Sequence, residues 1–182
     1  MAIFLRFLKK EKINMNKEQI YELLMNDHVA KYIEENLDYL FLGIPELVDT
    51  VGYPAKKGDY QFDVFHQILK ELEISPSDFV IRMVILLQDI GKPYMEDYDL
   101  QKFHYKDYKE ISCKMAHSIL MRFEFPWDFV HEVCTLIFPK DEILSSDMIL
   151  KQQKILQIHQ QVVLENIDMS NYQPKLLKTL NL

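Results

Sequence analysis

The positions of the hydrophobic residues along the chain predict a protein built almost entirely of helices. Apolar residues recur at helical steps of three and four, and strand-like alternation is nearly absent. The clearest case is the stretch 79–90, which is apolar on nearly all sides, as expected of a helix in the interior. We expect this central helix to begin with Ser75 as its cap and Pro76 in its first turn, and to end at Gly91 and Pro93.

The same pattern places the other elements. Asn16 followed by Gln19 is a capping box that predicts a helix start. The stretch 52–58, which has glycine at both ends and a proline between them, predicts a loop. Further helices are expected over 16–24, 29–42, 45–51, 62–73, 107–123, 126–138, 146–165 and 174–180. The fold class is therefore all-α, with no internal repeat.

Length and composition fit one folded domain. The chain has 182 residues, of which 48% are hydrophobic and 27% charged, and this is ordinary globular composition. We expect residues 1–15 to be a poorly ordered extension, with Met15 as an alternative start. Residues 16–140 would form the helical domain, and 141–182 would add C-terminal helices that pack on it. No apolar stretch is long enough to span a membrane, so no membrane partner is expected.

Charge and cysteine content narrow the function classes. With 21 basic and 28 acidic residues the net charge is −7, which argues against a broad nucleic-acid surface. The 2 cysteines are too few for a disulfide framework, and they form no zinc-binding pattern. Since no secretion signal is evident either, a reducing cytoplasmic location is the simplest interpretation. The sequence does not indicate an oligomeric state.

Three segments, taken in their order along the chain, resemble segments of a known family. Residues 86–93 read Leu-Leu-Gln-Asp-Ile-Gly-Lys-Pro, residues 63–69 read Asp-Val-Phe-His-Gln-Ile-Leu, and residues 107–112 read Asp-Tyr-Lys-Glu-Ile-Ser. Together they resemble the HD superfamily of metal-dependent phosphohydrolases, and within it the HD portion of bacterial tRNA nucleotidyltransferases (CCA-adding enzymes). Residues 17–51 resemble the helical lead-in of those enzymes. The resemblance covers roughly 16–140 and implies an HD-like helical domain.

The chain departs from this family at the metal ligands. In the register of the resemblance, Gln67, Gln88 and Tyr108 stand where the family has histidines, and Asp89 is retained. A neutral amide is a much poorer ligand for a divalent cation than an imidazole or a carboxylate. We therefore expect no cofactor, and a metal-free polar network of these four residues. If a metal binds at all, Asp89 is its expected ligand and the only candidate catalytic residue.

Four lysines lie along the chain near these positions and are candidates for phosphate binding: Lys92, Lys102, Lys106 and Lys109. The competing interpretation is an ordinary solvated face balanced by nearby acids. Two histidines are expected to play no part in the cleft. His66 is interpreted as an exposed or interface residue, and His159 as a scattered surface position.

Two functions of different classes follow from the resemblance. The first is a degenerate, metal-free HD-like domain without enzymatic activity, acting as a binding or regulatory module for a protein or a small phosphorylated ligand. The alternative is a divergent phosphohydrolase or phosphodiesterase that acts on a nucleotide or another phosphate ester. In it Asp89, alone or with Asp63 or Asp107, holds a Mg²⁺ or Mn²⁺ that activates water. A third possibility, an RNA-facing accessory, conflicts with the acidic balance. Because these residues contain no β-rich segment with the catalytic motif of a tRNA nucleotidyltransferase head, we do not expect that activity from them.

Overall fold

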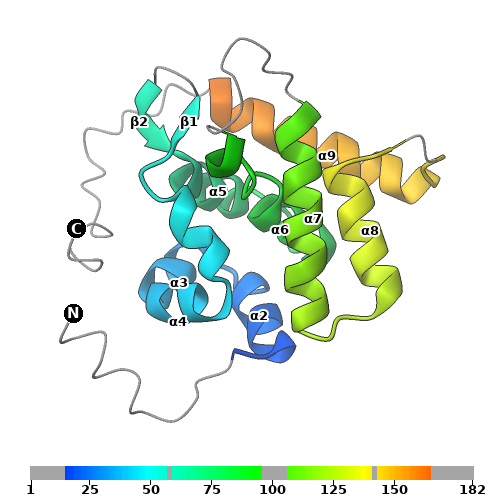
Figure 1. The fold of residues 1–182 in the computed structure, drawn as a ribbon, viewed down its shortest axis with the longest axis horizontal. Helices are drawn as coiled ribbons and strands as arrows, with labels where there is room; N and C mark the ends of the chain where they lie inside the picture. The colour runs from blue at the N-terminus through cyan, green and yellow to red at the C-terminus, as the bar shows by residue number, and fades with distance from the viewer. Residues whose placement is uncertain (1–14, 57–58, 96–105, 141–142, 165–182) are drawn as a thin grey trace.

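The most hydrophobic helix of the chain, α6 (Phe79–Leu87), lies in the middle of the fold, as the sequence predicts. In this computed structural model, which describes residues 15–56, 59–95, 106–140 and 143–164, α6 packs against α5 (Val64–Glu73), α7 (Lys106–Arg122) and α8 (Trp127–Ile137). Figure 1 shows α7 and α8 on one side of α5 and α6, and the N-terminal helices on the other side. The protein is an all-α single domain, and the predicted fold class is confirmed.

The N-terminal part consists of short helices. These are α2 (Lys17–Leu24), α3 (Val29–Glu35), α4 (Leu37–Gly43) and the 3₁₀ helix η1 (Pro45–Thr50). The predicted capping box is confirmed, because the Asn16 side chain accepts from the Gln19 backbone and the Gln19 side chain accepts from the Asn16 backbone, both at 2.9 Å. The predicted helix over 29–42 divides at Asn36, whose side chain donates to the Tyr32 carbonyl at 2.8 Å.

The loop predicted over 52–58 contains part of a β-hairpin instead. Strands β1 (Pro54–Lys56) and β2 (Asp59–Asp63) pair antiparallel, and β2 leads directly into α5. Asp63 closes the hairpin onto the helix. Its side chain caps α5 by accepting from the His66 backbone at 2.7 Å, and it also accepts from the Gly52 backbone at 2.8 Å. Strands this short carry too few residues for a period of two to be recognised in the sequence.

The start and end of α6 also differ from the prediction. Asp78, rather than Ser75, is the N-cap, and its side chain accepts from the Ile81 backbone at 2.9 Å. Ser75 instead accepts a hydrogen bond from a buried arginine. Arg82 is only 4% exposed and donates to the Leu24 carbonyl at 2.5 Å and to Ser75 Oγ at 3.1 Å. Arg82 therefore ties α6 to the end of α2, where helix carbonyls lack partners of their own.

The C-terminal helix α9 (Ser146–Leu164) crosses behind the bundle in Figure 1. It packs against α5, α6 and α8, and its Ile155 and Ile158 join the same hydrophobic core as Ile20 of α2. The helix predicted over 174–180 lies outside the described residues, as do residues 1–14 of the extension predicted over 1–15. Its last residue, Met15, is only 6% exposed and belongs to the core, so the prediction is wrong for that residue. No helix in the described part of the chain is both long and apolar enough to cross a membrane.

Candidate functional site

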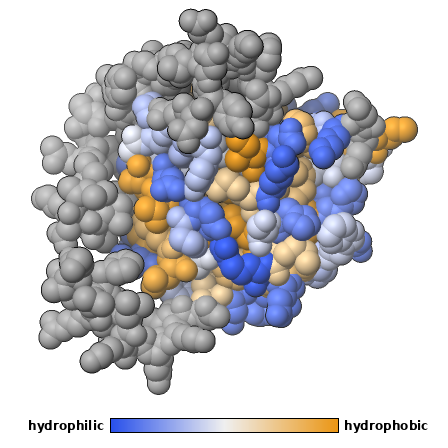
Figure 2. All heavy atoms as spheres, in the orientation of Figure 1, coloured by the Kyte–Doolittle hydropathy of each residue, from blue (hydrophilic) through white to orange (hydrophobic). Residues whose placement is uncertain are grey.

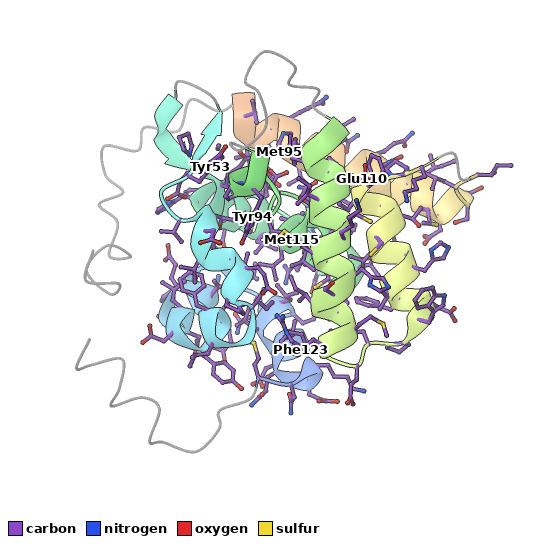
Figure 3. The ribbon with its side chains drawn as sticks, in the orientation of Figure 1. Tyr53, Tyr94, Met95, Glu110, Met115 and Phe123 are labelled. Carbon is purple, nitrogen blue, oxygen red and sulfur yellow. The ribbon has the colours of Figure 1, made fainter. Side chains whose placement is uncertain are left out.

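The four positions that the sequence resemblance assigns to a former metal site are buried. Gln67 lies on α5, Gln88 caps the end of α6, Asp89 follows it, and Tyr108 lies near the start of α7. Their exposed fractions range from 1% to 7%. A short 3₁₀ helix, η2 (Lys92–Met95), follows the end of α6. Figure 3 labels Tyr94 and Met95 on η2, between the hairpin and α7.

One half of the site is organised by Glu71, which the sequence analysis did not single out. Its carboxylate is 1% exposed and lies one turn after Gln67 on α5. Oε1 accepts from Gln67 Nε2 at 2.6 Å and lies 2.8 Å from His159 Nδ1 of α9. Oε2 accepts from Gln88 Nε2 at 3.0 Å. Glu71 thus binds both glutamines and joins α5, α6 and α9, and a buried carboxylate with this many donors is well satisfied.

The other half is organised by Asp89, which is held by two lysines. Lys92 Nζ lies 2.8 Å from Oδ2, and Lys109 Nζ lies 3.3 Å from Oδ1. Burial alone would raise the pKa of the Asp89 carboxyl, but the charges of Lys109 and Lys92 outweigh it and hold the pKa well below its usual range. Lys92 also donates to the carbonyl of Ala55 in β1 at 3.4 Å, which links the hairpin to the site.

Lys109 connects the two halves. Besides Asp89, its ammonium donates to Gln88 Oε1 at 3.0 Å, so that Gln88 is bonded to Glu71 on one side and to Lys109 on the other. Tyr108 takes part through its ring, whose centroid lies 5.4 Å from Lys92 Nζ and 5.3 Å from Lys109 Nζ. The predicted network therefore exists in a different form, with Glu71 and two lysines as its centres.

Gly91 lets α7 approach closely enough for these contacts. Its backbone N–H donates to Ser112 Oγ at 2.9 Å. A Cβ atom at this position would lie 2.6 Å from the Tyr108 carbonyl oxygen and 2.7 Å from the Ser112 backbone nitrogen, closer than van der Waals contact permits. A residue without a side chain here brings Lys109 within reach of Asp89.

The charged groups nearest to Asp89 are lysines rather than further metal ligands. Within the described residues, no group of three or more His, Cys, Asp or Glu side chains is placed to hold an ion. Each Asp89 oxygen lies against an ammonium group, and Gln88 Oε1 accepts a hydrogen bond from the ammonium of Lys109. A divalent ion would have to displace two lysines whose charge repels it.

The lysines proposed for phosphate binding fall into two groups. Lys92 and Lys109 meet at Asp89, where their charges are already balanced by a carboxylate. Lys106 is the first residue of α7, and Lys102 lies outside the described residues. The structure thus places two of the four candidates together in the site, where both are paired with the Asp89 carboxylate.

Both predictions about histidines are wrong. His66 is 7% exposed rather than on the surface, and its Nδ1 lies 2.7 Å from Asp63 Oδ1. It lines a hollow of about 210 Å³ beside α3, together with Lys70 and Glu73. His159 belongs to the network through its contact with Glu71. The spacing of Glu71 one turn after Gln67 was a usable signal in the sequence, whereas nothing local indicates that the distant His159 reaches the same point.

Comparisons with protein-family models, with curated proteins and with solved structures found no match to this chain. The relation to the HD superfamily consequently rests on the three sequence segments described above and stays a prediction.

Proposed function

We propose that this protein is a non-catalytic, metal-independent HD-like domain that acts as a binding or regulatory module. The observation that carries the proposal is the pairing of Asp89 with Lys92 and Lys109, at 2.8 and 3.3 Å. Asp89 is the one metal-site residue of the HD superfamily that the sequence retains, and both of its oxygens are engaged by the protein's own cations. The ammonium groups supply the positive charge that a metal would otherwise supply.

The electrostatic argument concerns what a divalent ion would gain and lose. It would gain Asp89 as a ligand, and it would meet two ammonium groups within the same few ångströms. Like charges at this separation repel by about 4 kcal/mol per pair of unit charges at an effective dielectric constant near 20. The amide nitrogens of Gln67 and Gln88 already donate to Glu71. Because both amides are neutral, they offer the ion no compensating negative charge. Activation of water by a metal is therefore disfavoured at this site.

A protein is the partner class that the described surface favours over a phosphorylated ligand. The two lysines best placed for phosphate are engaged by Asp89. Large apolar side chains, in contrast, are exposed on the last two helices, with Trp127 at 62% and Leu150 at 64%. Figure 2 shows hydrophobic residues reaching the surface among hydrophilic ones on the face drawn there. Aromatic and aliphatic side chains of this kind are frequent contacts in protein interfaces.

The proposal is tested by activity and by ligand-dependent stability. The wild-type protein is assayed with phosphate mono- and diesters and with nucleotides, in Mg²⁺ and in Mn²⁺. Melting temperatures are measured with each ion and with inorganic phosphate. Asp89→Asn is the test variant, and Asp128→Asn, an exposed acid of α8, is the matched control. We expect no turnover and no stabilisation of the wild type beyond that of the control.

The alternative enzyme makes the opposite prediction. If the protein is a divergent phosphohydrolase or phosphodiesterase, Mn²⁺ or Mg²⁺ supports ester hydrolysis in the wild type and in Asp128→Asn, and Asp89→Asn abolishes it. That pattern would overturn the proposal. Stabilisation of the wild type by phosphate alone would instead reassign the partner class from a protein to a phosphorylated ligand.

A further inference from the structure

The two cysteines of the chain, which lie 21 residues apart, meet where α7 packs against α8. The Cys134 thiol donates to the Cys113 carbonyl oxygen at 3.7 Å, which brings the two cysteines together across the helix interface. Both side chains are half-buried, so small reagents reach them without unfolding of the helices. Since the sequence holds only 2 cysteines, this pair accounts for all of its thiol chemistry.

The surroundings make the two thiols unequal. The hydrogen bond from Cys134 lowers the pKa of the Cys113 thiol to about 7, and the charges of Lys140 and Lys114 act in the same direction. The same hydrogen bond raises the pKa of Cys134. Figure 3 shows Glu110 on the side of α7 that faces α8, one turn before Cys113, and Met115 on the opposite side. Cys134, whose thiol donates to the Cys113 carbonyl, is thus the partner that keeps its proton, and Cys113 is the one more readily deprotonated.

From this geometry we propose that Cys113 and Cys134 are a reversible thiol–disulfide pair that links α7 to α8 when a small disulfide oxidises it. The Cys113 thiolate attacks one sulfur of the oxidant, forms a mixed disulfide and releases the first thiolate. Cys134 then gives up its proton, attacks Cys113 Sγ and releases the second. The two protein thiols lose two electrons and two protons, and the oxidant is reduced to two thiols.

The pair lies close to the site described above. Cys113 follows Lys109 by one helical turn on α7 and therefore lies on the same side of that helix. A bond between α7 and α8 at this turn would fix the helix that carries the lysine holding Asp89. Oxidation would also restrict the unfolded chain, which raises the melting temperature by roughly 5–10 °C for a loop of this length.

The test treats the folded wild-type chain with oxidised glutathione near pH 7 and follows its intact mass. We expect monomeric protein lighter by two hydrogen atoms, with no glutathione retained, and recovery of the original mass and melting temperature on reduction. In Cys134→Ser the mixed disulfide has no second thiol to resolve it, so this variant should keep one glutathione on Cys113. In Cys113→Ser the remaining Cys134 has no second thiol either, so any glutathione that it takes up should also be retained.

Other outcomes contradict the proposal. Wild-type protein that retains glutathione on each cysteine would show that the two sulfurs do not close onto each other. Covalent dimers would show that the thiols pair between molecules instead. No reaction under conditions in which unfolded protein reacts would show that the pair is closed to small disulfides. Both serine variants are checked by circular dichroism, so that a folding defect is separated from a change in reactivity.

Discussion

Replacing Asp89 by asparagine removes one negative charge from between two lysines and leaves the shape of the side chain unchanged. Asp89 is 1% exposed, while the side chains of Lys92 and Lys109 are 13% and 19% exposed. At 2.8 and 3.3 Å, each ion pair has a gross attraction of about 5–6 kcal/mol at an effective dielectric constant near 20. The cost of burying the carboxylate offsets much of this attraction.

The expected net effect is a loss of about 3 kcal/mol in the free energy of unfolding. Breaking a buried pair typically costs 3–5 kcal/mol, roughly, because it leaves uncompensated charge. The value here falls at the lower end because both lysines keep partial access to water. A second substitution, Lys109→Met, removes one of the stranded charges and should recover about 1 kcal/mol in the double variant.

The assay is urea unfolding followed by circular dichroism, with Asp128→Asn as the control that should stay within about 0.5 kcal/mol of the wild type. The pH dependence provides a second readout. Because the folded-state pKa of Asp89 is depressed, its stabilisation is complete above the unfolded-state pKa of about 4 and is lost as the pH falls toward the folded-state value. The difference between wild type and Asp89→Asn should therefore shrink below about pH 4. Equal or greater stability of Asp89→Asn at neutral pH would refute the reasoning, since that is the behaviour of an acid without partners.

Three further substitutions test other contacts by the same unfolding assay. Glu71→Gln should lower the free energy of unfolding by about 2–3 kcal/mol, because one acceptor oxygen is replaced by an NH₂ group that faces the amide donors of Gln67 and Gln88. A loss below roughly 0.5 kcal/mol would show that the carboxylate is dispensable. Arg82→Met should cost about 3 kcal/mol, because it strips partners from buried carbonyls, and unchanged stability would contradict that role. Gly91→Ala should cost at least about 2 kcal/mol, because its Cβ would meet the Tyr108 carbonyl, and a neutral result would mean that α7 can move away.

The fold was largely predictable because its signals are local. The central helix α6 was expected from its continuous apolar residues, and the capping box at Asn16 marked the start of α2. The predictions that failed concerned residues whose roles depend on contacts between distant segments. Ser75 has the character of a helix cap, yet it is used to bind Arg82. The hairpin is too short for its alternation to be recognised, and it is closed by Asp63, whose second role as helix cap is local.

The candidate site was predictable in its positions and not in its bonds. Gln67, Gln88 and Asp89 were singled out by register, and all are buried at the centre of the fold. Their partners were not foreseen: the spacing of Glu71 one turn after Gln67 was a usable signal that the prediction overlooked, and nothing local marks the distant His159 of α9. The lysines were read as candidates for an external phosphate. An internal carboxylate neutralises a lysine as well as an external phosphate does, and the sequence alone does not distinguish these two partners.

The most direct test of the central claim is the metal content of the protein, purified without chelator from cells supplied with manganese and zinc. If Lys92 and Lys109 supply the positive charge at Asp89, elemental analysis of the wild type should find far less than one divalent ion per chain, and no more than in Asp89→Asn. A stoichiometric divalent ion in the wild type that is lost in Asp89→Asn and retained in Asp128→Asn would contradict the account.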